Sequence, residues 1–253
     1  GEKSFLGHSG RLNGDEIIDI VCRQPATSRF IARHMYNFFV ADESQVPAWS
    51  VTPPHDPAAI DVMERALVDN DYEIRPVLRL LFKSDFFKEA RFSRMKSPAE
   101  VVIGTLRLAG GSEFPAPGFG ILSRQTGYMG QDLMNAPSVE GWHTGSEWIN
   151  SGSLMRRTNF FADVMGDLER PGVQAIVSDL RAMGDMSPGE FVDTCLAIMG
   201  PLEVDDRTRS ELLSHAAEGG DLRWDSRGDI DTSTERVSEM LQLIVSVRDY
   251  QFA

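Results

Sequence analysis

The chain has 253 residues, of which 42% are hydrophobic and 25% are charged, a composition typical of a packed globular protein and unlike a disordered or collagen-like chain. Acidic residues number 38 and basic residues 25, so the formal net charge is −13 at pH 7, which argues against nucleic acid or an anionic membrane surface as a partner. No run of sequence approaches the roughly 18 apolar residues that a transmembrane helix needs, so we expect a soluble protein without a membrane span.

Helix start signals recur along the chain. The strongest are Ser97-Pro98-Ala99-Glu100 and Ser187-Pro188-Gly189-Glu190, in which a hydroxyl, a first-turn proline and a glutamate combine to cap the helix. Apolar residues then follow at helical spacing, and no segment shows convincing period-two alternation. Weaker starts are Asn13 to Glu16, Asp56-Pro57, Thr208 to Glu211 and Thr232 to Glu235. The predicted helices cover residues 15–23, 26–40, 57–70, 74–88, 98–109, 118–130, 152–167, 172–183, 188–199, 207–218 and 233–250.

These patterns predict an all-α fold, a multi-helix globular array with long ordered loops and no substantial sheet. Residues 45–55 are rich in proline and are predicted to cross the surface in an extended form. Residues 132–150 are too long and too aromatic for a routine connection. We expect a helical core over residues 1–165, which carries an aromatic Gly/Pro loop at 131–152, and a C-terminal helical subdomain over residues 166–253.

Several apparent catalytic or metal motifs fail on inspection. Ser9 resembles the serine of a nucleophile elbow, but Arg11 stands where that motif needs glycine, so a glycine-rich turn is expected instead. The acidic stretch 221–235 lacks the sixth-position glycine of an EF-hand. The histidines show neither H-E-x-x-H nor an i, i+4 pair, so neither a metal nor a cofactor is expected. The five histidines are His8, His34, His55, His143 and His215.

The two cysteines and the arginines near residue 30 favour structural roles. Cys22 and Cys195 share no C-x-x-C spacing and indicate two buried thiols, with one disulfide between them as the alternative. Three aromatic residues of the helix at 26–40, Tyr36, Phe38 and Phe39, are predicted to face the core. Its arginines are predicted to hold carboxylates or carbonyl groups inside the domain, because a guanidinium group supplies several fixed donors.

The aromatic loop is the candidate ligand-binding region. Two indoles, an imidazole and an amide in a glycine-punctuated loop can form a platform for a sugar ring or a peptide. The alternative is that both tryptophans fold inward as plugs for the helical core. The candidate residues are Gln131, Trp142, His143, Trp148, Asn150 and Arg156.

A family resemblance emerges at the same region. The residues that carry it are Met129-Gly130-Gln131, Ala136-Pro137, Val139, Gly141-Trp142, Trp148-Ile149-Asn150, Arg156 and Asn159-Phe160, with Gln24-Pro25-Ala26-Thr27, Ile74-Arg75-Pro76 and Lys96-Ser97-Pro98-Ala99-Glu100 before them. Together they resemble a large bacterial family known as domain of unknown function 1800. The likeness is specific up to about Phe161 and becomes a vaguer helical likeness beyond Gly166.

The resemblance implies a location and partners but no catalytic residue. Members of the family are usually longer, with another helical portion ahead of this region, and are commonly exported and encoded beside a sulfatase-like protein. The chain is therefore expected to correspond to a C-terminal half and to be secreted or periplasmic, although it contains no signal peptide. Its expected partners are the missing N-terminal portion of the same protein and a sulfatase-like exported protein.

Three functional hypotheses follow, and whether the chain is an enzyme stays open. The first is an exported helical binding or accessory protein that contacts a protein or glycan through residues 131–159. The second is a secreted hydrolase acting on an extracellular polymer, which requires His143 or His55 beside an acid or a nucleophile. The third is a structural unit of a cell-surface assembly, which requires an extensive exposed apolar patch.

Overall fold

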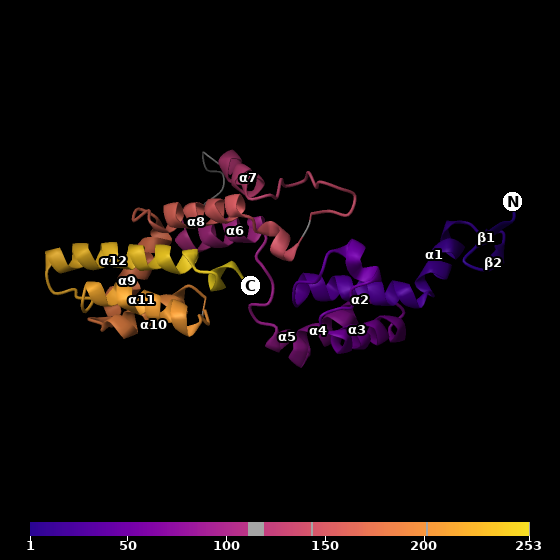
Figure 1. The fold of residues 1–253 in the computed structure, drawn as a ribbon, viewed down its shortest axis with the longest axis horizontal. Coiled ribbons are helices and arrows are strands. Elements are labelled where there is room, and N and C mark those ends of the chain that lie inside the picture. The colour runs from indigo at the N-terminus through magenta and orange to yellow at the C-terminus, as the bar shows by residue number, and fades with distance from the viewer. Residues whose placement is uncertain (111–118, 143, 201, 253) are drawn as a thin grey trace. The chain divides into compact units, whose positions relative to one another are not determined.

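The computed structural model describes residues 1–110, 119–142, 144–200 and 202–252 and confirms the predicted all-α class. Helices account for almost all of its regular structure, and the only sheet in the described ranges has two short strands (Figure 1). Contacts divide the chain into two compact units, Gly1–Arg94 and Met95–Ala253. Each unit is described below by itself.

The first unit opens with a β-hairpin that the sequence pattern did not predict. Strands β1 (Lys3–Phe5) and β2 (His8–Gly10) pair antiparallel, and Leu6 and Gly7 between them both have positive φ, 45° and 81°, as a two-residue hairpin turn requires. Three residues per strand are too few to show a two-residue period. The serine of the rejected nucleophile elbow, Ser9, lies in the exposed second strand.

Five α-helices and a 3-10 turn complete the first unit. They are α1 (Gly14–Cys22), α2 (Pro25–Phe39), η1 (Val46–Ser50), α3 (Pro57–Asp69), α4 (Ile74–Lys83) and α5 (Asp85–Glu89). The single helix predicted at 74–88 is two helices, because Ser84 has extended ψ and its side-chain oxygen accepts the Phe87 amide at 3.2 Å, starting α5 anew. The core lies between α2, α3 and α4 and contains Ala32, Met35, Tyr36, Val40, Ala59, Ile60, Met63, Ala66, Leu67, Val77 and Leu81.

The second unit is a larger helical array. Its helices are α6 (Pro98–Ala109), α7 (Phe119–Tyr128), η2 (Gly145–Trp148), α8 (Ser151–Met165), α9 (Pro171–Met183), α10 (Pro188–Ile198), α11 (Asp206–Glu218), α12 (Arg227–Ser246) and η3 (Asp249–Gln251). One continuous hydrophobic core extends from Val101 on α6 to Tyr250 in η3. The boundary expected after residue 165 falls inside this unit, where Ser238 of α12 donates to the Met165 carbonyl of α8 at 3.4 Å.

Both cysteines are free thiols, so the alternative of a disulfide is not realised. Cys195 on α10 is fully buried, and burial raises the pKa of its thiol to about 12. Cys22, at the end of α1, is half-buried. None of the helices in the described ranges combines the length and the hydropathy that a bilayer crossing requires.

Candidate functional site

Two of the residues predicted to bind a ligand are capping groups. The Gln131 side-chain oxygen accepts the Ala99 amide at 2.8 Å in the first turn of α6. Asn150 is the N-cap of α8, where its side-chain oxygen accepts the Ser153 amide at 2.9 Å. Both polar side chains therefore satisfy helix N-termini, a use that short-range patterns did not reveal for Gln131 because its partner is 32 residues away.

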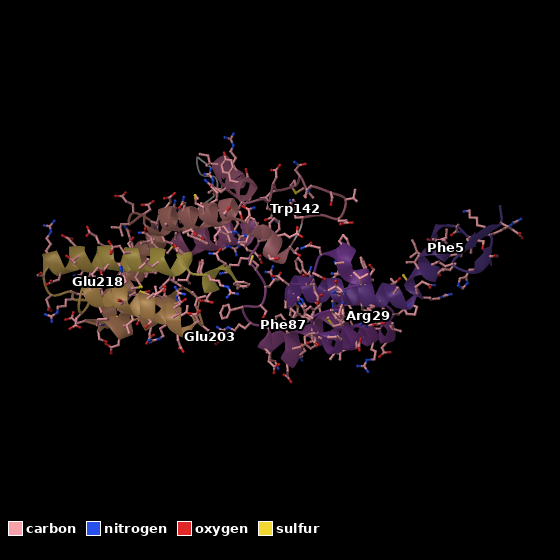
Figure 2. All side chains as sticks on the ribbon, in the orientation of Figure 1. Phe5, Arg29, Phe87, Trp142, Glu203 and Glu218 are labelled. Carbon is pink, nitrogen blue, oxygen red and sulfur yellow. The ribbon has the colours of Figure 1, made fainter. Side chains whose placement is uncertain are left out.

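The tryptophans of the same region differ in burial. Trp148 is only 7% exposed, and its carbonyl accepts a hydrogen bond from the Ser153 hydroxyl at 2.8 Å. Trp142, on the irregular segment between α7 and η2 (Figure 2), is half-buried, and its indole N–H has no hydrogen-bond partner in the described ranges. His143 lies outside the described residues.

Arg156, the last of the predicted set, lies on the exposed side of α8. Its guanidinium carbon is 5.4 Å from the centre of the Tyr128 ring at the end of α7, and Tyr128 is itself 57% exposed. This cation–π contact joins two helices at the surface. The idea that these residues form one ligand site remains a prediction.

A different aromatic surface stands out in the first unit. Phe30, His34 and Phe38 follow one another at four-residue intervals along α2 and so share one face of the helix. All three are exposed, Phe30 by 48% and Phe38 by 69%. The prediction that Tyr36, Phe38 and Phe39 face the core is thus wrong for Phe38 and correct for Tyr36, which is buried, while Phe39 is half-buried and packs against the core.

Neighbouring rings extend this face at both ends. At one end, Trp49 of η1 lies with its ring centre 4.6 Å from that of His34 and 5.7 Å from that of Phe30. At the other end, Phe38 contacts Phe39, which in turn contacts the half-exposed Phe82 of α4 at 5.3 Å. We call Phe30, His34, Phe38, Trp49 and Phe82 the α2 aromatic surface.

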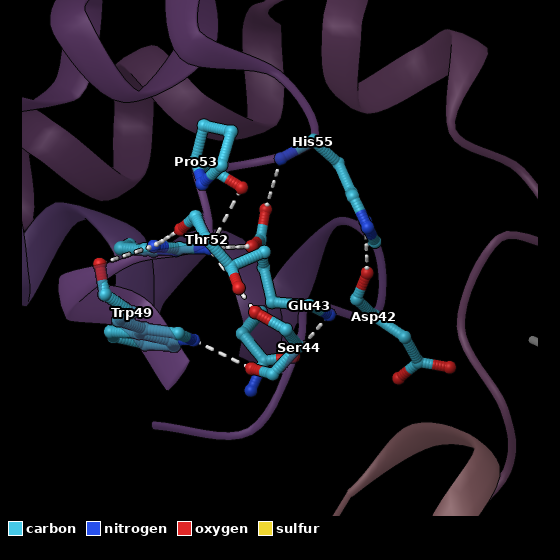
Figure 3. Close-up of polar contacts among 9 residues, drawn as sticks. Asp42, Glu43, Ser44, Trp49, Thr52, Pro53 and His55 are labelled. Atoms are coloured by element: carbon cyan, nitrogen blue, oxygen red, sulfur yellow. Dashed lines mark hydrogen bonds and ion pairs between the residues drawn. The ribbon is translucent and has the colours of Figure 1, made fainter. Parts of the chain in front are cut away.

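A buried ion pair fixes the segment that carries Trp49 (Figure 3). Arg33 of α2 donates through Nε and Nη2 to one carboxylate oxygen of Glu43, at 3.0 and 2.6 Å, and the Glu43 side chain is 0% exposed. The remaining guanidinium donors reach the carbonyls of Thr52 at 2.9 Å and Pro53 at 3.2 Å. The predicted structural role for the arginines of this helix is confirmed at Arg33, with both a carboxylate and carbonyl groups as partners.

The Trp49 ring itself is held from two sides. Its indole N–H donates to the Ser44 carbonyl at 2.6 Å, and the Arg33 guanidinium carbon lies 4.6 Å from the ring centre (Figure 3). The stretch 45–55, predicted to be an extended crossing, therefore contains a 3-10 turn tied to the buried pair. A ring so restrained loses little further freedom when a ligand covers it.

The sequence analysis did not predict this surface, although the spacing of the aromatic residues along the helix indicates it. A helix with aromatic residues at positions 30, 36, 38 and 39 cannot turn all of them to one side, since positions 30 and 38 share a face that 36 does not. That mismatch indicates that part of the aromatic set is exposed. Trp49 could not be placed, because its position depends on the long-range Arg33–Glu43 contact.

The structure gives the hydrolase hypothesis no positive support among the described residues. The imidazole of His55 pairs with a main-chain group, the Asp42 carbonyl, at 2.8 Å. Partial burial lowers the pKa of His34, whose ring neighbours are aromatic. Within the described ranges, no group of three or more His, Cys, Asp or Glu side chains is placed to hold a metal ion.

Comparison with known proteins gives a family and no named function. No curated protein and no solved structure matches this chain. The family described as "Protein of unknown function (DUF1800)" matches residues 1–252, so the specific likeness extends well beyond Phe161 through the whole second unit. The chain belongs to this family.

Proposed function

We propose that this protein is a binding or accessory protein that holds a protein partner through the α2 aromatic surface. The observation that carries the proposal is a set of exposed rings on one face of α2, beside a tryptophan fixed by a buried ion pair. Singly exposed apolar residues are ordinary, but a contiguous apolar patch on a folded protein is typical of an interaction site. Aromatic residues also dominate the energetically important centres of protein interfaces.

The chemistry of the surface favours a protein over a glycan. Sugar recognition needs several convergent hydrogen-bonding groups around the stacking ring. On this surface the Trp49 N–H is already used by Ser44, and the Arg33 donors are used by Glu43 and main-chain carbonyls. His34 is the one member with polar side-chain atoms other than the Trp49 N–H. A partner that presents apolar side chains therefore fits best.

The distribution of charge along the chain also supports a protein partner. The first unit has 12 basic and 14 acidic residues, whereas the second has 13 basic and 24 acidic ones, so the aromatic surface lies on the nearly neutral unit. Binding there depends chiefly on apolar burial and is expected to vary little with salt, unlike association steered by charge. We include in this proposal the exported location and the sulfatase-like protein suggested by the family resemblance.

The test compares two pairs of surface substitutions in binding to the sulfatase-like protein, measured by calorimetry. Phe30→Ser with Phe38→Ser removes two exposed rings, and we expect the Kd to rise at least tenfold with little change in Tm. Ile103→Ser with Met183→Ser removes 47% and 62% exposed side chains from the second unit and should leave the Kd unchanged.

Three outcomes speak against the proposal. Equal binding by both variant pairs rejects the α2 aromatic surface as the contact. If the chain still binds a polysaccharide fraction after all protein has been removed from that fraction, the result favours a glycan as the ligand. Concentration-dependent self-association of the chain alone, lost in the Phe30→Ser, Phe38→Ser variant, favours a structural unit built from copies of this chain.

A further inference from the structure

The second unit contains a buried arginine whose donors are only partly used. Arg157 of α8 is 0% exposed. Its Nη1 donates to the Lys96 carbonyl at 2.8 Å, while Nε and Nη2 have no hydrogen-bond partner among the described residues. Leaving donors of a charged group buried and unpaired costs several kcal/mol as an order of magnitude, so this arrangement needs an explanation.

The unpaired donors lie on one edge of the guanidinium group. Nε–H and one N–H of Nη2 lie in the guanidinium plane and point in parallel from the same edge, and their separation matches the two oxygens of a carboxylate or a phosphate. In the first unit the corresponding edge of Arg33 binds a carboxylate, since its Nε and Nη2 both donate to Glu43. Arg157 has the donor edge without the oxyanion.

A second cation makes the surroundings positive. Lys96 donates through Nζ to the Tyr250 carbonyl at 2.6 Å, and Nζ lies 4.0 Å from the centre of the Tyr250 ring. Burial lowers the pKa of Lys96 to about 8 and that of Arg157 to about 10, and the charge of Glu100 opposes both shifts. The Glu100 carboxylate accepts the Ser97 amide at 2.7 Å in the cap of α6.

The C-terminal segment lies against Lys96. The Lys96 amide donates to the Gln251 carbonyl at 2.9 Å, and Met95 forms an isolated β-bridge with Phe252. Gln251 is buried, and its side-chain oxygen has no hydrogen-bond partner within the part of the chain that the structure describes. Because Arg157 is closed to solvent, a ligand can reach its free edge only when neighbouring chain moves aside.

We propose that the Nε–Nη2 edge of Arg157, with Lys96 beside it, is a binding site for a small molecule that carries an oxyanion, either a carboxylate or a phosphate group. The site is independent of the α2 aromatic surface, because every residue that defines it belongs to the second unit. It can therefore be tested whether or not the proposed protein partner exists.

The experiment follows thermal unfolding of the whole chain in acetate, phosphate and chloride at equal ionic strength. We expect at least one of the two oxyanions to raise Tm by about 2 °C or more over chloride, and the better of the two identifies the ligand class. Arg157→Met should abolish that rise. The matched control is Arg156→Met, which removes the neighbouring exposed arginine and should retain it.

A second measurement guards against an Arg157 variant that fails to fold. In the wild-type protein, the ¹⁵Nε–¹H signal of Arg157 should be protected from solvent exchange and should shift on titration with the stabilising anion, while that of Arg156 should not. If the Arg157 signal shifts with neither acetate nor phosphate, an internal water or a rearranged Gln251 pairs with the free guanidinium donors instead. That result, or equal Tm values in all three salts, overturns the proposal.

Discussion

Two arginines in this protein are buried, Arg33 and Arg157, and they differ in how many of their donors are paired. Arg33 meets a carboxylate and three main-chain carbonyls, those of Trp49, Thr52 and Pro53, so its burial is compensated. Arg157 meets one carbonyl. The sequence around an arginine does not predict whether its donors will be paired, because each partner comes from a distant turn or helix.

Removing the carboxylate at position 43 tests the buried pair. Glu43→Gln leaves the Arg33 charge buried without a counter-charge, and we expect the free energy of unfolding to fall by about 3–5 kcal/mol. Asp61→Asn is the matched control, because the Arg29–Asp61 pair is largely exposed and its loss should cost less than about 1 kcal/mol. Urea unfolding measures both, and equal losses would contradict the role given to Glu43.

Lys96 gives a pH dependence whose sign follows from its lowered pKa. Between pH 8 and 10.5 the folded state releases a proton that the unfolded chain retains, so stability rises with pH in this window by at most about 1.4 kcal/mol per unit. Lys96→Met should remove the rise. Cys195 opposes it above pH 9, since its pKa is raised, but equally in both proteins. A wild-type minus variant difference that stays flat from pH 8 to 10 would contradict the burial of Lys96.

At the scale of helices, the close approach of α6 and α9 depends on one glycine. A Cβ added to Gly172 would lie 2.1 Å from the Leu108 carbonyl oxygen and 2.6 Å from the Ala109 carbonyl carbon, both backbone atoms. Side-chain rotation cannot relieve such a contact, so the helices would have to separate.

A matched glycine occupies the same place in another helix. Gly172 and Gly189 each follow the first-turn proline of their helices, α9 and α10, but a Cβ on Gly189 meets nothing within 4 Å. We expect Gly172→Ala to lower Tm by several degrees and Gly189→Ala to leave it unchanged or raise it slightly, because alanine favours helix. Thermal unfolding of both variants decides, and similar Tm values would reject the close approach.

Local signals determined most helix starts correctly. Asn13, Asp56, Ser97 and Ser187 are all N-caps in the structure. The helix predicted to begin near Thr232 begins at Arg227, capped by Ser226 with Asp229 completing the capping box, a role that glutamate or glutamine usually has. The position of Trp49 could not be predicted from such signals, since it depends on the contact between Arg33 and Glu43.

At the scale of the whole molecule, the chain has two hydrophobic cores, one in each unit. Trp49 is the only tryptophan of the first unit, whereas Trp142, Trp148 and Trp224 belong to the second. The sequence predicted a helical chain of more than one part, but core membership depends on long-range contacts that no local pattern carries.

This division predicts separable unfolding. In a protein whose only tryptophan is Trp49, Glu43→Gln should shift the fluorescence transition to lower urea. In a protein in which Trp49 is replaced by phenylalanine, the remaining tryptophans all belong to the second unit, and Glu43→Gln should leave the midpoint of their fluorescence transition close to its original value. Equal shifts of both signals would show that the two cores unfold as one cooperative unit.

The central claim, that the α2 aromatic surface holds a protein partner, is tested most directly by site-specific photocrosslinking to the sulfatase-like protein. A photoreactive phenylalanine analogue at position 38 should give a single covalent product with that protein, formed equally at low and high salt. The same analogue at position 183, an equally exposed site on α9, should give none. Products of equal yield from both positions, or none from position 38, would contradict the account.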